Sequence, residues 1–319
     1  MSGPDLITVG TWREEVTSMG PVLGALDGLR RRDRRGAVRA SFLTLMAVGG
    51  ASVELDEVFD IVHRLGVVQP SRVIVVRVVG GEDHRLSARV GVHLLARGDQ
   101  CLGIDDIALE VAGPVTSHLD SVVEPLTLPD LPVVVWCRER LPPPHSPLIG
   151  VADHMIVDST RAGGRSRLPA VSRLSRRVPL TDFAWLRLAP LRRRLAAALR
   201  RPGAGDVLGE ATAAIVAGPD PERALLAGWL GDRLPAATVT DDGETELPSV
   251  VLSGADFRLQ VETTEAAVTA TLERHGHQQW CSRATSAPAT TEGLLAEALL
   301  HLRPDPVFLG ALAAAAEQP

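Results

Sequence analysis

The sequence contains neither lysine nor tyrosine, since all 33 basic residues among its 319 residues are arginine. Without lysine, a Schiff-base lysine, a P-loop lysine and a lysine general base are all excluded. Without tyrosine, dehydrogenase mechanisms that depend on a Tyr-Lys pair are excluded too. The composition alone therefore removes several common catalytic mechanisms.

Cysteine is scarce. Cys101, Cys137 and Cys281 are far apart and odd in number, which indicates neither a disulfide framework nor a CxxC metal or redox motif. Each is expected to be a small buried hydrophobic residue. Cys137 directly follows a predicted strand, so we expect it to be the most accessible of the three thiols.

Long apolar runs are also missing. No stretch approaches the roughly 18 residues that a membrane helix needs, and the N-terminal residues lack the charged-then-apolar pattern of a signal peptide. These absences predict a cytoplasmic protein that does not bind membranes.

Charge is segregated along a chain whose overall net charge is −6. Residues 161–201 contain 12 Arg and a single acid, Asp182, whereas the segments before and after carry net charges of −6 and −11. A segment this basic must be solvated, neutralised by the rest of the protein, or used to bind an anionic partner. We expect it to fold back on its acidic neighbours, with an acidic protein partner as the next alternative. Nucleic acid is not expected, because few aromatic residues lie among the arginines.

Apolar periodicity predicts an α/β fold with an open, mostly parallel sheet. Residues 1–36 are expected to form an N-terminal helical segment, with the helix itself over 5–35. A strand over 37–48, a helix over 55–65 and a strand over 72–79 follow in the order of a parallel strand–helix–strand unit. Further strands are predicted over 86–94, 107–111, 131–136 and 155–157.

A boundary near residue 200 is expected to separate this α/β domain, 37–200, from a smaller α+β domain, 201–319. Residues 161–178 lack an apolar period and are predicted to be an arginine-rich loop or mobile arm, followed by an interrupted helix capped by Thr181. The second domain is predicted to contain a helix opened by Asp220-Pro221, a β meander over 248–284, and terminal helices over 291–302 and 305–316.

Familiar catalytic motifs are missing, including GxGxxG after a strand, GxSxG and HExxH. A hydrolytic or metal constellation can be drawn around His154 with Asp153, Asp158 and Ser159. However, neighbouring residues of a strand point to opposite faces, so the obvious pairing of His154 with Asp153 fails and a structural network is favoured. The sequence therefore predicts no enzyme activity, no cofactor and no metal.

Four segments carry a resemblance to a known family. They are QPSRVIVV (69–76), DSVVEPLTLPDLPVVVWC (120–137), ADHMIVDST (152–160) and LTDFAWLRLAPLR (180–192). In this order and spacing they resemble the glucose-6-phosphate dehydrogenase assembly protein family, OpcA, specifically over residues 37–200. The sequence has Gln69, Cys137, His154 and Leu191 where that family commonly has His, Trp, Arg and Trp.

The resemblance implies a non-catalytic protein that binds glucose-6-phosphate dehydrogenase and favours its active oligomer, supplying NADPH through the oxidative pentose phosphate pathway. Preferential binding of the active conformation by about 1.4–3 kcal/mol would give roughly ten- to hundredfold activation. Its candidate partner-binding residues are the polar or aromatic members of the matching segments, namely Arg72, Asp130, Asp158, Ser159, Trp185, Arg187 and Arg192. Each could instead serve the fold, as a helix cap or turn residue does.

Two alternatives stay open. The first is an enzyme or sensor that binds a phosphorylated sugar or a nucleotide, because ligands often lie outside the carboxyl ends of parallel strands and arginines can hold phosphate. Stabilisation by glucose 6-phosphate, NADP or 6-phosphogluconate would favour it. The second is nucleic-acid binding by the arginine-rich arm, which would show a steep salt dependence.

Overall fold

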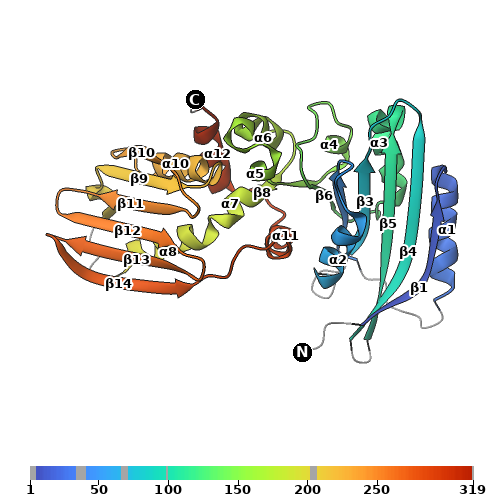
Figure 1. Ribbon diagram of the computed structural model, residues 1–319, viewed down its shortest axis with the longest axis horizontal. Helices are drawn as coiled ribbons and strands as arrows, with labels where there is room; N and C mark the ends of the chain where they lie inside the picture. The colour runs from blue at the N-terminus through green and yellow to red at the C-terminus, as the bar shows by residue number, and fades with distance from the viewer. Residues whose placement is uncertain (1–4, 34–40, 66–70, 98–99, 202–206, 318–319) are drawn as a thin grey trace. The chain divides into compact units, whose positions relative to one another are not determined.

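The computed structural model describes residues 5–33, 41–65, 71–97, 100–201 and 207–317 (Figure 1). The chain divides into two compact units, each described here by itself. Unit 1 comprises Met1–Val157 and Arg177–Leu180, and unit 2 comprises Asp158–Arg176 and Thr181–Pro319. This division differs from the predicted boundary near residue 200.

An eight-stranded sheet forms the centre of unit 1, with the strand order β1-β4-β5-β3-β2-β6-β7-β8. The strands are β1 (Asp5–Glu14), β2 (Leu43–Gly49), β3 (Ser71–Val78), β4 (Arg85–Arg97), β5 (Gln100–Ala112), β6 (Val133–Cys137), β7 (His154–Val157) and β8 (Leu180–Asp182). The helices are α1 (Met19–Arg31), α2 (Leu55–Leu65), α3 (Leu119–Val123) and α4 (Leu148–Val151), with 3₁₀ turns η1 (Gly113–His118) and η2 (Glu124–Leu126).

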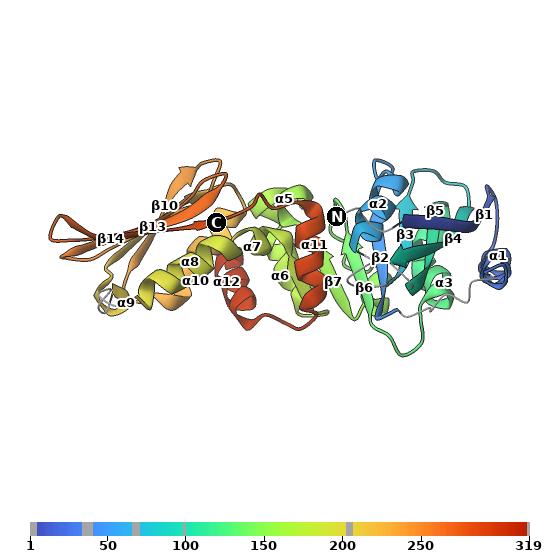
Figure 2. The ribbon, with the colours of Figure 1, turned by 90° about the horizontal axis from the view of Figure 1, so that it is seen from below.

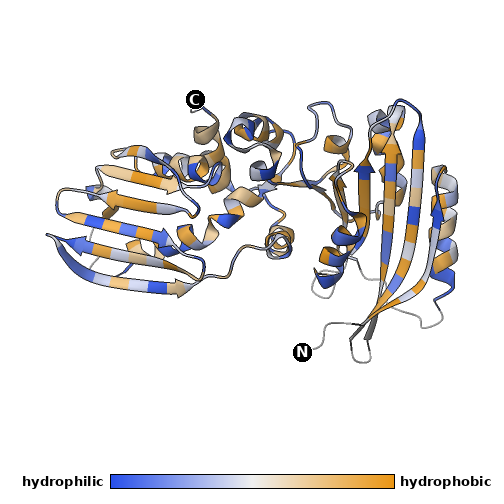
Figure 3. Ribbon diagram, viewed as in Figure 1, coloured by the Kyte–Doolittle hydropathy of each residue, from blue (hydrophilic) through white to orange (hydrophobic). Residues whose placement is uncertain are grey.

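The sheet is mostly parallel, as predicted. Strands β5, β3, β2, β6 and β7 pair in parallel, whereas β1 and β4 add antiparallel pairs at one edge. The middle strands are buried along their length because both faces of a parallel sheet are covered, and Val73–Val76 of β3 are fully inaccessible. Strand β4 instead alternates hydrophobic and hydrophilic residues over much of its length (Figure 3), and β5 carries the adjacent polar residues Asp105 and Asp106.

The prediction of one helix over residues 5–35 is wrong. Residues Asp5–Glu14 form β1, which pairs antiparallel with β4, and the helix is confined to Met19–Arg31. The β-branched residues Ile7, Thr8, Val9 and Thr11 favour an extended strand over a helix. The strand predicted over 37–48 is present over Leu43–Gly49, while residues 37–40 lie outside the described part of the chain.

A six-stranded sheet forms the centre of unit 2, with the order β10-β9-β11-β12-β13-β14. The strands are β9 (Ala213–Gly218), β10 (Thr238–Glu244), β11 (Ser249–Ser253), β12 (Phe257–Thr263), β13 (Ala267–Arg274) and β14 (His277–Thr285). The helices are α5 (Ser159–Ala162), α6 (Leu168–Ser175), α7 (Phe183–Arg187), α8 (Ala189–Leu199), α9 (Val207–Glu210), α10 (Glu222–Arg233), α11 (Thr291–Leu300) and α12 (Pro306–Glu317), with the 3₁₀ turn η3 (Gly164–Arg167).

Helices cover one face of this second sheet. Helix α8 contacts β12 and β13, and α10 contacts β9 and β10, both on the same side of the sheet (Figure 2). Helix α12 packs closely on α10 at Gly228, where an added Cβ would lie 2.5 Å from the carbonyl oxygen of Ala311. The predicted meander is confirmed as β11 to β14, and the predicted terminal helices as α11 and α12.

The prediction of a loop or mobile arm over 161–178 is wrong. The segment folds as α5, η3 and α6, and Leu168, Val171 and Leu174 on one face of α6 are buried. Helix α6 contacts α12, so these apolar side chains place the segment in unit 2. These three apolar residues recur every three positions, which is a helical spacing, but the polar residues between them made the pattern hard to recognise in the sequence.

The helix expected to begin after Thr181 starts one residue later. Thr181 lies within the short strand β8, and the Oδ1 atom of Asp182 accepts a hydrogen bond from the backbone N–H of Ala184 at 3.0 Å. Asp182 is therefore the N-cap of α7, and aspartate is a favoured residue there because its carboxylate accepts from otherwise unpaired N–H groups.

Candidate functional site

The seven candidate partner-binding residues fall into the two units. Arg72 and Asp130 belong to unit 1, and the other five belong to unit 2. Those five come from two chain segments that are more than 20 residues apart, and the structure brings them together around α5 and α7. They are Asp158, Ser159, Trp185, Arg187 and Arg192.

An ion-pair cluster lies at the start of α5. The guanidinium of Arg187 donates to both carboxylate oxygens of Asp158, with Nη1–Oδ1 at 3.0 Å and Nη2–Oδ2 at 2.6 Å. The same Nη1 lies 3.1 Å from Oε1 of Glu222, which also accepts from the hydroxyl of Thr160 at 3.1 Å. We call Asp158, Thr160, Arg187 and Glu222 the Asp158 cluster. Two carboxylates and one guanidinium share it.

Burial governs the protonation of this cluster. The side chains of Asp158 and Glu222 are each 4% exposed, and that of Arg187 is 27% exposed. Burial raises the pKa of the Glu222 carboxyl even though Arg187 opposes the shift. Burial alone would lower the pKa of Arg187, but its hydrogen bonds and charge interactions with Asp158 and Glu222 outweigh it, so the net pKa is raised. Arg187 therefore stays charged and neutralises buried acid.

Asp182 lies beside this cluster and joins α5 to α7. Its Oδ1 accepts from the backbone N–H of Ser159 at 3.1 Å as well as from that of Ala184. Burial raises the pKa of Asp182 to about 6, despite these hydrogen bonds, and the nearby charge of Asp158 adds to the shift. Ser159 is fully buried, so its contribution here is a backbone N–H.

Trp185 is held by three neighbours. Its indole Nε1–H donates to Oδ2 of Asp305 at 2.9 Å, its ring lies 5.8 Å from the ring of Phe308, and the guanidinium of Arg192 lies 3.6 Å from its centroid. Burial lowers the pKa of Arg192 to about 10. The arrangement is a cation–π contact on a tryptophan that is 2% exposed, so it anchors α7 and α8 to α12.

The two remaining candidates belong to unit 1 and have different structural roles. Arg72 of β3 is buried, and its Nη1 donates to the carbonyl oxygen of Leu126 at 2.7 Å while its Nη2 lies 3.5 Å from Oδ2 of Asp105. Asp130 is exposed and has a φ of 64°, a left-handed conformation that aspartate tolerates better than most residues. Arg72 thus supports the interior and Asp130 a turn.

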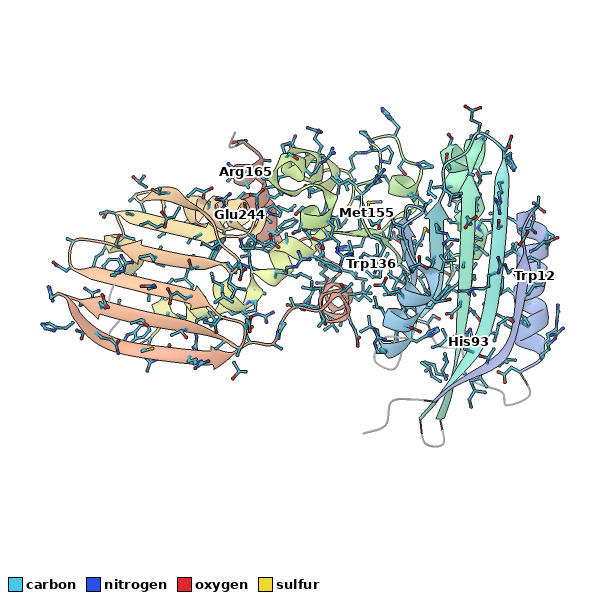
Figure 4. All side chains as sticks on the ribbon, viewed as in Figure 1. Trp12, His93, Trp136, Met155, Arg165 and Glu244 are labelled. Atoms are coloured by element: carbon cyan, nitrogen blue, oxygen red, sulfur yellow. The ribbon has the colours of Figure 1, made fainter. Side chains whose placement is uncertain are left out.

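Sequence reasoning missed a histidine pocket on the α2 side of the sheet. His63 of α2 and His93 of β4 place their Nε2 atoms 2.7 and 3.3 Å from Oδ2 of Asp106 in β5, and Figure 4 labels His93. Together with Phe59 and Arg89, these residues line a pocket of about 250 Å³, which we call the histidine pocket. Polar residues inside otherwise apolar strands were the available signal, but their spacing along the sequence did not show that they meet.

Acidification should weaken unit 1 through His93. Burial is the main cause that lowers the pKa of His93, against the opposing charge of Asp106. The unfolded chain therefore binds this proton more readily, so stability falls as the pH drops below about 6.5. We expect His93→Gln to reduce the slope of unfolding free energy against pH by up to about 1.4 kcal/mol per pH unit between pH 5.5 and 6.5.

Urea unfolding at pH 7.5, 6.5 and 5.5 measures that slope. The matched control is His84→Gln, because the side chain of His84 is exposed. An unchanged slope in His93→Gln would contradict the role given to burial of this ring.

The constellation drawn around His154 is not assembled as a catalytic group. Asp153 accepts from the backbone N–H of Val133 at 2.8 Å, and Asp158 is engaged by Arg187. His154 is buried in β7. Both carboxylates therefore serve local structure.

The accessibility expected for the cysteines is reversed. Cys137 is buried, and burial raises the pKa of its thiol to about 12, whereas Cys281 of β14 is exposed. The side chain of Cys101 lies outside the described part of the structure. Cys137 is the last residue of β6, and all five residues of this strand are buried in the parallel part of the sheet, so the strand end is not exposed as expected.

Some arginines of the basic segment 161–201 pair with carboxylates of their own unit. Besides Arg187, Arg165 lies 3.6 Å from Asp241 and Arg193 lies 2.6 Å from Glu297. The predicted pairing of this segment with acidic neighbours is thus seen for these residues. Across the residues that the structure describes, we find neither a group of three or more His, Cys, Asp or Glu side chains that could hold a metal ion nor a helix that could span a bilayer.

Two family models match the chain. One, described as the N-terminal domain of a glucose-6-phosphate dehydrogenase subunit, matches residues 63–174, and the other, described as the C-terminal domain of that subunit, matches residues 178–312. The Asp158 cluster takes Asp158 and Thr160 from the first match and Arg187 and Glu222 from the second. Its members therefore lie in both matched segments.

No curated protein matches the chain. Among solved structures, a protein from Sinorhizobium meliloti assigned as a myo-inositol dehydrogenase aligns with a TM-score of 0.36 and 11% sequence identity, over 86% of this chain and 95% of that one. A TM-score this low supports no assignment of fold or activity.

Proposed function

The chain belongs to the glucose-6-phosphate dehydrogenase assembly protein family, OpcA, and from this we propose that it binds glucose-6-phosphate dehydrogenase in the cytoplasm and favours its active oligomer. The observation that carries the proposal is the pair of family matches, which together reach from residue 63 to residue 312. The chain would act without catalysing a reaction, through preferential binding of the active dehydrogenase conformation.

The polar groups of both units support a non-catalytic role. In the Asp158 cluster, each carboxylate is engaged by Arg187. In the histidine pocket, both imidazoles are directed at Asp106. Carboxylates that are paired and only 4% exposed serve the fold, whereas a catalytic acid or base needs access to substrate.

The seven candidate residues would contribute in two ways. Asp130 is exposed, and Arg187 and Arg192 are partly so, which leaves these three able to touch a partner. The other four, Arg72, Asp158, Ser159 and Trp185, are buried and would act as positioning residues that shape the contact surface.

Adding the purified chain to glucose-6-phosphate dehydrogenase of the same organism should raise its rate roughly ten- to hundredfold, corresponding to a conformational preference of about 1.4–3 kcal/mol. The effect should be largest at low enzyme concentration, where the oligomer dissociates. Initial rates measure activation, and light scattering on a sizing column measures the mass of the complex. The heat-denatured chain serves as the control. Neither rate change nor co-migration would remove the proposal.

The alternative of a phosphate-binding enzyme or sensor makes a different prediction. It requires arginines of segment 161–201 to be available for an anion, yet Arg187 and Arg193 are engaged by Asp158 and Glu297. Thermal unfolding with glucose 6-phosphate, NADP or 6-phosphogluconate separates the two, because only the alternative predicts stabilisation of the isolated chain.

A further inference from the structure

The second sheet leaves one face open to solvent. Helices α8 and α10 cover the opposite face (Figure 2), where alternate residues such as Val250, Leu252 and Leu259 are buried. On the open face the strand pairings align one row of side chains across five strands, each half-buried or exposed. This central row consists of Ile215, Val251, Gln260, Thr271 and Cys281.

Charged side chains flank the central row on both sides. Arg258 and Glu273 are register partners on β12 and β13 and lie on one side of it. Glu262 on β12 and Arg283 on β14 lie on the other side, and both are register partners of Thr269 on β13. All four charged side chains are exposed. Along β12 the open face therefore reads Arg258, Gln260, Glu262, which is positive, neutral, negative.

This order is self-complementary. Consider a two-fold axis that runs along the central row, perpendicular to the strands and between the two sheets. It would place the open faces of two copies against each other, with each strand antiparallel to the same strand of the second copy. Arg258 would then face Glu262 of the second copy, and Glu262 would face its Arg258, as a two-fold interface requires. Glu273 would come within reach of Arg283 of the second copy by the same operation. From this charge pattern we infer that the open face binds a second copy of the same chain.

The charges also select the axis. A two-fold axis parallel to the strands and running along β12 would instead place Arg258 over its own equivalent and Glu262 over its own equivalent. Like charges brought together in this way oppose association. The central row adds side chains of small or medium size, with Ile215 and Val251 as the apolar pair, so two sheets can approach closely there.

The size of the face predicts weak association. Six strands spaced about 4.8 Å apart and about seven residues of roughly 3.4 Å each span on the order of 600 Å² per copy. This is below the roughly 800 Å² per partner of a stable interface. We therefore expect a weak dimer that forms only at micromolar or higher concentrations of the chain.

Sedimentation of the full chain alone, from about 5 to 200 µM, tests the inference because it covers concentrations at which a weak dimer should form. Arg258→Glu and Glu262→Arg should each weaken the dimer about tenfold or more, since each sets like charges against one another twice. An equimolar mixture of the two variants should associate within about threefold of the unaltered chain, because both cross-pairs are then of opposite sign. Glu246→Arg, an exposed charge change off this face, is the matched control.

Cross-linking reports the geometry. Cys281 lies in the central row and should meet Cys281 of the second copy, so a short bismaleimide should join two chains in a Cys101→Ser background. Thermal midpoints of all variants confirm that they are folded.

A mass that stays monomeric at every concentration, or a mixture that does not recover association, would overturn the inference. Variants that lose co-migration with the dehydrogenase while the unaltered chain stays monomeric would assign this face to the dehydrogenase instead. Sedimentation and cross-linking omit the dehydrogenase, so their failure is separate from failure of the proposed function.

Discussion

Arg187→Leu is expected to destabilise unit 2 by about 3–5 kcal/mol, the largest loss we predict for a single substitution. The guanidinium compensates two carboxylates that are each 4% exposed, and leucine would leave Asp158 and Glu222 buried without it. An unpaired buried charge loses its hydration and gains nothing in return, which is why the cost exceeds that of the lost bonds. Arg187→Lys keeps a positive charge without the two parallel hydrogen bonds, so we expect an intermediate loss.

Urea unfolding measures the free energy, and hydrogen exchange localises the loss to α5, α7 and α10. Arg193→Leu is the matched control, because Arg193 also pairs with a glutamate but its side chain is 72% exposed. An exposed pair of this kind contributes about 0–1 kcal/mol. Equal losses in the two leucine variants would show that the Asp158 cluster does not depend on Arg187.

Asp182→Asn should stabilise unit 2 at pH 7.5, by up to about 3 kcal/mol. The carboxyl pKa is about 6 in the folded chain against an ordinary 3.8, so the folded form holds its proton more tightly than the unfolded form. Stability from this group is therefore fully present below about pH 4 and is lost as the pH rises to about 6. Asparagine carries no charge, and its carbonyl oxygen can still accept from Ser159 and cap α7 through Ala184.

Unfolding free energies at pH 4, 5, 6 and 7.5 measure this effect as the difference between the variant and the unaltered chain. The difference should grow between pH 4 and 6 and then stay constant. Asp256→Asn, an exposed aspartate with a side chain that is 63% accessible, should leave the pH dependence unchanged. A variant that is less stable at pH 7.5, with the original slope retained, would contradict the burial of a charged Asp182.

Much of the fold was predictable because apolar periodicity determines it. Helix α2 was predicted over 55–65, where the structure has it, since Val58, Phe59, Val62 and Leu65 recur on one face. The apolar run of β3 and the alternating strands of the meander gave equally direct signals. The mostly parallel sheet followed from the strand–helix–strand order.

Predictions failed where local pattern and tertiary contact disagree. The first strand depends on pairing with β4, about 80 residues away in the sequence, which no local window contains. Helix α6 has only Leu168, Val171 and Leu174 to mark its buried face, and five arginines between residues 165 and 177 masked them. The high arginine content therefore led to the prediction of a loop, although packing of this segment against α12 stabilises a helix.

The candidate site was partly predictable, through the family resemblance and not through chemistry. That resemblance selected Asp158, Trp185, Arg187 and Arg192, which the structure brings together in unit 2. Asp182 lies in a matching segment but was not selected, and the resemblance gave no reason to select Glu222 or Asp305, although all three complete these contacts. Such partners depend on the path of the chain, and a single sequence does not contain it. Direct contact of the selected residues with the dehydrogenase stays a prediction.

Two adjacent aspartates in β5 determine how that strand is aligned. Asp105 is paired with Arg30 and Arg72 on one face, and Asp106 with His63 and His93 on the other. Because their chain neighbours are the buried Ile104 and Ile107, sliding β5 by one position in either direction would set an isoleucine against either the arginines or the histidines. Either shifted register would therefore lose the polar contacts of one of the two aspartates. Asp105 and Asp106 thus favour the observed register of β5 over both alternatives during folding.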